Sequence, residues 1–136
     1  MANNHELSSA LRRLIFLAGI SVSVYAINRL FLIQMLPEWG FLKYYFSDIL
    51  ALPVYLPTSL YLAWRLHLVS GEYRLGFTHI LGAVLIFSLL FEGIVPVFDA
   101  TTTRDPYDVL AYFAGGLLVY IVGSAGRHRR NLTQEE

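Results

Sequence analysis

Residues 76–95, GFTHILGAVLIFSLLFEGIV, contain one acidic side chain and no lysine or arginine. An apolar run of about 18 or more residues is typical of a transmembrane helix, because a rise of about 1.5 Å per residue then covers a hydrocarbon core of about 30 Å. Pro96 follows directly and ends the pattern. The stretch therefore predicts a helix that spans a membrane, with Glu92 near its end.

Three further apolar blocks precede and follow this stretch. The first begins like a signal peptide, but its apolar run is too long for one. The second contains Pro53 and Pro57, which membrane helices tolerate when neighbouring groups satisfy the freed carbonyls. We therefore predict an all-α integral membrane protein, a four-helix bundle in a single domain. Its helices are expected at about residues 14–36, 46–66, 76–95 and 107–123 of a domain spanning 1–136.

Composition supports the membrane class. Of the 136 residues, 56% are hydrophobic and 15% are charged, whereas soluble domains carry about 25% charged residues. Net charge is zero without a dense basic face, so we expect no nucleic-acid partner. The chain has no cysteine, which excludes thiol chemistry, and no histidine pair has metal-ligand spacing. We expect no metal and no cofactor, and the lipid bilayer as the main partner.

The distribution of lysine and arginine predicts the orientation. Four spans place both termini and the middle loop on one side of the membrane. That side carries seven basic residues: Arg12, Arg13, Arg65, Arg74, Arg127, Arg129 and Arg130. The opposite side carries Lys43 and Arg104. The positive-inside rule then predicts that both termini are cytoplasmic, in a bacterial inner membrane.

Four ionisable side chains are predicted to share one depth. Arg29 lies about 22 Å along the first helix from its cytoplasmic start, and Glu92 about 24 Å along the third. Asp48 and Asp108 open the second and fourth helices from the outer side. A charged group at membrane depth usually has a structural or functional reason. These four residues are therefore the predicted site, in the outer half of the bundle.

Helical spacing suggests how the site is assembled. If the polar stripes face inward, Arg29 lies among the carboxylates, and its planar guanidinium can bind two of them. Surrounding polar residues are Tyr25, Asn28, Arg104, Asp105 and Tyr112. Two alternatives stay open: the charges only lock helix packing, or Asp48 and Asp108 are N-terminal caps that suit the helix dipole. No catalytic residue is identified, because no serine has a neighbouring base.

Small residues on the fourth block suggest close helix packing. Gly115, Gly116 and Gly123 lie on it, together with Ala111 and Ala114. Such a surface lets helix backbones approach closely. The contact is expected inside the chain or, alternatively, with a homo-oligomeric or hetero-oligomeric partner.

The stretch TTRDPYDVLAYFAGGLLVY, residues 102–120, resembles the signature of VanZ-like membrane proteins. In that signature a basic residue precedes an Asp that opens the last helix in a D-x-L-A-N-x-x-G pattern. Arg104, Asp108, Ala111 and Gly115 match it, whereas Tyr112 stands where the family usually has Asn. The resemblance implies a role in the cell envelope and an association with glycopeptide resistance.

Together, these patterns predict a small multi-pass inner-membrane protein of the cell envelope. Its outer polar pocket is expected to bind an anionic group at Arg29, from an anionic lipid or an envelope precursor. The first alternative is an assembly subunit of a membrane complex. The second is a membrane-embedded hydrolase or transferase that uses the carboxyls as acid and base on lipid-linked substrates.

Overall fold

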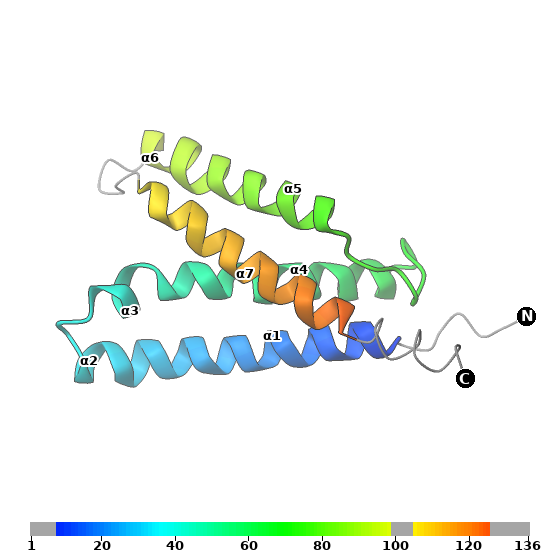
Figure 1. Cartoon of the computed structure of the whole chain (residues 1–136), viewed down its shortest axis with the longest axis horizontal. Helices are drawn as coiled ribbons and strands as arrows, with labels where there is room; N and C mark the ends of the chain where they lie inside the picture. The colour runs from blue at the N-terminus through cyan, green and yellow to red at the C-terminus, as the bar shows by residue number, and fades with distance from the viewer. Residues whose placement is uncertain (1–7, 99–104, 126–136) are drawn as a thin grey trace, which may run out of the picture.

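A computed structural model describes residues 8–98 and 105–125, and all the elements in these ranges are helices (Figure 1). Four helical segments are long and apolar enough to cross a membrane: Ser9–Met35, Gly40–Arg65, Phe77–Ile94 and Pro106–Ser124. The predicted all-helical class with four membrane-grade helices is therefore confirmed. The first helix begins before its apolar block because the Ser8 hydroxyl caps it, accepting from the Leu11 N–H at 3.2 Å.

The four segments divide into shorter elements. The first consists of α1 (Ser9–Ile27), the π-helical η1 (Asn28–Leu32) and α2 (Ile33–Met35). The second consists of the short α3 (Gly40–Tyr44) and α4 (Phe46–Arg65). The third consists of α5 (Phe77–Ser88), the π-helical η2 (Leu89–Ile94) and α6 (Val95–Phe98), and the fourth is α7 (Pro106–Ser124).

Two helices form the centre of the bundle. α4 and α7 pack against each other, α1 packs on both, and α5 packs mainly on α7 and barely touches α4. Figure 1 shows the start of α1, the end of α4, the start of α5 and the end of α7 at one end, here called the terminal end. α2, α3, α6 and the start of α7 lie at the other end, here called the distal end. Because α5 barely touches α4, the bundle is open on this side rather than closed.

The core lies where α1, α4, α5 and α7 meet. Leu52, Ile80 and Val119 are almost completely buried in it. Ala10 and Leu11 are buried at the start of α1, and from Leu11 the buried positions repeat at alternating steps of three and four residues: Leu14, Ala18 and Ser21. Asn28, at the start of η1, continues the series one heptad later. This spacing forms a narrow seam along one side of the helix.

Gly115 sets the distance between α4 and α7. A Cβ atom at this position would overlap the backbone carbonyl oxygen of Ile49 and would lie 3.0 Å from Pro53 Cδ. Pro53 has no N–H, so the Ile49 carbonyl lacks its usual partner four residues along the helix. The Gly115 backbone lies against this freed carbonyl, where a weak Cα–H···O contact can form.

The other glycines of α7 also face the interior. A Cβ atom at Gly116 would lie 2.6 Å from Ile80 Cγ2, and one at Gly123 would lie 3.8 Å from Leu14. Gly115 and Gly116 are buried with Ala111. Of the small residues on this helix, Ala111, Gly115 and Gly116 therefore pack inside the chain, whereas Ala114 is exposed.

Gly115→Ala is expected to lower the free energy of unfolding by about 1–3 kcal/mol or more, because the added methyl group meets rigid backbone. Unfolding of the purified protein in detergent measures the change. Gly19→Ala is the control, since a Cβ atom there has no neighbour within 4 Å. Its greater helix propensity is expected to leave stability unchanged or to raise it by up to about 1 kcal/mol. Equal stability of both variants would contradict the close α4–α7 contact.

Candidate functional site

Three acidic side chains from three helices meet at the distal end. Asp48 lies in the first turn of α4, Glu92 in η2 and Asp108 in the first turn of α7. The carboxyl groups of Asp48 and Asp108 contact each other, and that of Asp108 also contacts Glu92. We call these three residues the carboxyl cluster.

The Gly115 contact positions two members of the cluster. Asp48 directly precedes Ile49, whose carbonyl receives Gly115. Asp108 lies seven residues before Gly115, and therefore on the same face of α7. Tyr112 lies between them on this face, is 4% exposed, and its hydroxyl contacts Asp48. Close packing of the two helices therefore brings the carboxyls together.

Asp105 connects the cluster to the start of α7. Its Oδ1 accepts a hydrogen bond from the Tyr107 N–H at 3.0 Å, which makes it the N-cap of this helix. Its Oδ2 accepts from the Tyr45 hydroxyl at 2.6 Å, and its own N–H donates to Glu92 Oε2 at 2.8 Å. Asp105 thus ties α7 to the segment before α4 and to η2.

The Asp105 carboxyl is held in its charged form. The hydrogen bond from the Tyr45 hydroxyl and, secondly, the one from the Tyr107 N–H hold the pKa of Asp105 below its usual value. Both donors are uncharged. Within residues 8–98 and 105–125, the negative charge of Asp105 therefore has hydrogen bonds but no basic side chain to balance it.

Aromatic rings surround the Tyr112 side of the cluster. Phe87 of α5 packs edge-on against Tyr112, with ring centroids 5.8 Å apart, and Phe91 of η2 lies 6.3 Å from the same ring. Ser88, one turn before Glu92, has a buried hydroxyl without a hydrogen-bond partner in the described part of the chain. These contacts make α5 and η2 part of the wall of the site.

The structure does not bring Arg29 to the carboxyl cluster. Its side chain is exposed, and it is not among the groups that act on Asp48 or Asp108. The reason is the narrow buried seam of α1, which passes through Ser21 and Asn28. Arg29 lies one residue, or about 100° around the helix, beyond it. Tyr25, which was expected on the same face, is 42% exposed.

Asn28 takes the inward position that was expected for Arg29. It is fully buried, and its Nδ2 donates to the Leu42 carbonyl at 2.9 Å, which ties η1 to α3. Its Oδ1 has no partner among the described residues. Arg104, the other expected basic member, lies outside the described residues.

Tyr45 was not among the residues predicted for the site. The available signal was its position three residues before Asp48, close to one helical turn.

The chemistry of the site follows from its charges. No group of three His, Asp or Glu side chains in the described ranges is arranged to hold a metal ion. Carboxylates in contact repel one another unless a proton or a positively charged group neutralises them. The site can therefore exchange a proton or bind a cationic group.

Comparisons with protein-family models, with curated proteins and with solved structures found no match for this chain. The resemblance to VanZ-like proteins therefore rests on the residues quoted for it.

Tyr45→Phe is expected to reduce the acid sensitivity that Asp105 confers. Because the folded-state pKa of Asp105 is lowered, its contribution to stability is complete above the unfolded value of about 3.9 and is lost as pH falls through the folded value. Removal of the Tyr45 hydroxyl raises the folded pKa toward the unfolded one. Thermal unfolding in detergent between about pH 7 and pH 2.5 should then show a lower midpoint at neutral pH and a smaller further loss in acid. Tyr61→Phe is the control, and an unchanged acid profile for Tyr45→Phe would contradict the assignment.

Proposed function

We propose that this chain is a small multi-pass protein of the bacterial inner membrane that takes part in a cell-envelope process. Its carboxyl cluster lies in the outer half of the membrane and binds a positively charged group. The observation that carries this proposal is the contact between carboxyls of three helices without a basic partner among residues 8–98 and 105–125. The resemblance of residues 102–120 to VanZ-like proteins supports the envelope role.

A purely structural role for the cluster has less support. A charged cluster that only holds helices together is expected to pair opposite charges. Arg29 was the basic residue predicted for this role. Arg29 is exposed, so repulsion among the acidic side chains is not offset by it. At an effective dielectric constant of about 20, two charges 4 Å apart interact with about 4 kcal/mol. Where both groups are ionised, a bound cation removes this cost, so the cluster is suited to a ligand that brings a positive charge.

Under this proposal, an anion bound at Arg29 would occupy a position separate from the carboxyl cluster. The exposed guanidinium lies near the distal end of the first helix, where a long side chain can reach the membrane surface. There it is suited to lipid phosphate groups. The carboxyl cluster, in contrast, repels anions.

A second candidate function is supported by the Asp48–Asp108 contact. Paired carboxyls in different environments can divide the roles of general acid and general base. A membrane-embedded hydrolase or transferase on lipid-linked substrates would use them in this way. Turnover that survives both Asp48→Asn and Asp108→Asn would exclude this candidate.

The terminal end is expected to face the cytoplasm, because Arg12, Arg13, Arg65 and Arg74 lie at or next to it. Green fluorescent protein fused to the C-terminus should therefore fluoresce in cells. Alkaline phosphatase fused at the same point should be inactive, since it needs the periplasm. An active phosphatase fusion would reverse the orientation and place the carboxyl cluster on the cytoplasmic side.

Asp108→Asn is expected to abolish binding of a small amine. The probe is ethylammonium chloride, compared with sodium acetate at matched ionic strength. In the wild-type protein the amine should raise the thermal midpoint in detergent, and this shift should disappear in Asp108→Asn. At pH 9 and without the amine, the variant should be more stable than the wild type by about 1 kcal/mol or more, because repulsion among the carboxylates of the cluster is relieved.

Glu38→Gln is the matched control, because Glu38 is an exposed acidic residue of the same end. It should keep the amine-induced shift. Loss of stability in Asp108→Asn at every pH, with an unchanged amine response, would instead identify the cluster as structural.

A further inference from the structure

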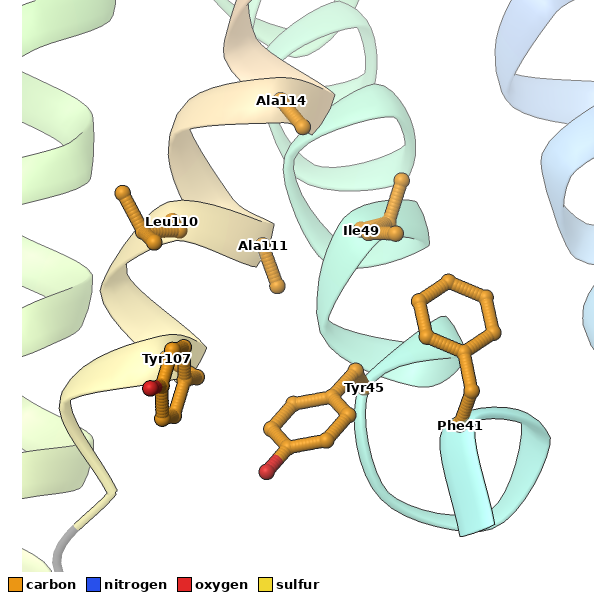
Figure 2. Close-up of a pocket in the computed structure, with 7 residues that line it drawn as sticks. All are labelled: Phe41, Tyr45, Ile49, Tyr107, Leu110, Ala111 and Ala114. Carbon is orange, nitrogen blue, oxygen red and sulfur yellow. The ribbon is translucent and has the colours of Figure 1, made fainter. Parts of the chain in front are cut away.

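A groove lies beside the carboxyl cluster, between the start of α7 and the segment formed by α3 and the start of α4. Its volume is about 480 Å³. Figure 2 shows its seven lining residues: Phe41, Tyr45, Ile49, Tyr107, Leu110, Ala111 and Ala114. Five of them are apolar, and the other two are tyrosines.

The groove lies at membrane depth. Its walls belong to the apolar segments Gly40–Arg65 and Pro106–Ser124, both of which are long enough to span a bilayer. Small side chains on α7, at Ala111 and Ala114, leave space opposite Ile49 (Figure 2). Ala114 is exposed, so the groove opens to the surroundings of the bundle. In a bilayer these surroundings are lipid chains.

One end of the groove is polar. Figure 2 shows Tyr45 and Tyr107 at the end where α7 begins, and the Tyr45 hydroxyl is bound to Asp105 there. Asp105 also reaches Glu92 through its backbone N–H. Asp105 does not line the groove, but its bond to Tyr45 places a carboxylate next to the polar end of the groove. The hydrogen-bond donors to this carboxylate among the described residues are uncharged.

We propose that the groove binds a phospholipid with a primary ammonium head group, its acyl chain between α4 and α7 and its ammonium against the Asp105 carboxylate. This inference rests on the proposed function, because Asp105 is joined to Glu92 of the carboxyl cluster by its backbone N–H and would extend the cation site toward the groove. Charge complementarity selects this occupant: a carboxylate attracts an ammonium group, whereas it repels lipids of net negative charge. A lipid is also the molecule that a membrane-depth groove meets first.

Native mass spectrometry of the full chain tests the proposal. The protein is released from nanodiscs with equal amounts of phosphatidylethanolamine and phosphatidylglycerol of identical acyl chains. Phosphatidylethanolamine should be retained at least fivefold more often. Ala114→Trp fills the groove and should abolish this retention. Ile121→Trp, at an exposed position of α7 outside the groove, should keep it.

Asp105→Asn removes the negative charge of this residue but keeps a side chain that can cap α7. Asn caps a helix about as well as Asp, so α7 should still begin correctly while the head-group preference falls about fivefold. A preference that is unchanged in both Asp105→Asn and Ala114→Trp would overturn the proposal. Equal retention of the two lipids by the wild type would also overturn it.

A second copy of the chain is the competing occupant. The sequence has no cysteine, so Ala114→Cys introduces a single thiol. A disulfide-linked dimer formed in membranes through this thiol would place a second copy in the groove and overturn the lipid assignment. A monomer that retains phosphatidylethanolamine supports it.

The ethylammonium experiment distinguishes failure of the lipid assignment from failure of the proposed cation site. If the wild type responds to the soluble amine but retains no phosphatidylethanolamine, the lipid assignment fails and the proposed cation site stands. If it responds to neither, both fail.

Discussion

The contact between Gly115 and the Ile49 carbonyl is the constraint on which the rest of the structure depends. Membrane helices gain little from burying apolar surface against one another, so close packing and polar contacts hold them together. Pro53 frees the Ile49 carbonyl, and Gly115 has no side chain to keep α7 away from it. The two central helices therefore approach at the level of Asp48, which precedes Ile49. Asp108, two turns before Gly115, is carried to the same level from the other side.

The same contact explains why the bundle is open. With α4 and α7 pressed together, α1 and α5 pack on this pair instead of closing a ring of four helices. α5 follows α7 and leaves α4, so η2 brings Glu92 to the start of α7. On another face, small side chains of α7 leave the groove beside Ile49. Site and groove are thus two consequences of one close approach, and Asp105 belongs to both through its bonds to Glu92 and Tyr45.

The helices and the position of a residue along each helix could be predicted from the sequence, but the direction of side chains around a helix only in part. A bilayer admits only segments that satisfy their own backbone groups, so hydropathy identified four helices, and the rise per residue placed Asp48, Glu92 and Asp108 at one level. The direction of Arg29 depended on which stripe of the first helix is buried, and this stripe passes through Asn28. Pro53 was expected to be tolerated within its helix. The contact between the freed Ile49 carbonyl and Gly115 could not be predicted, because it depends on which helix packs against α4.

The electrostatics of the α7 N-terminus favour a cationic ligand. A helix N-terminus carries about half a positive charge, which stabilises a nearby carboxylate. One N-terminus can offset only part of the charge of Asp105, Asp108 and Glu92, and Asp105 already uses the Tyr107 N–H as its cap. The remaining potential at this end is negative wherever these groups are ionised. A ligand that brings one positive charge and few anionic groups relieves this potential at no cost to the cap. Asp105 has a second oxygen, whose partner among the described residues is the neutral Tyr45 hydroxyl.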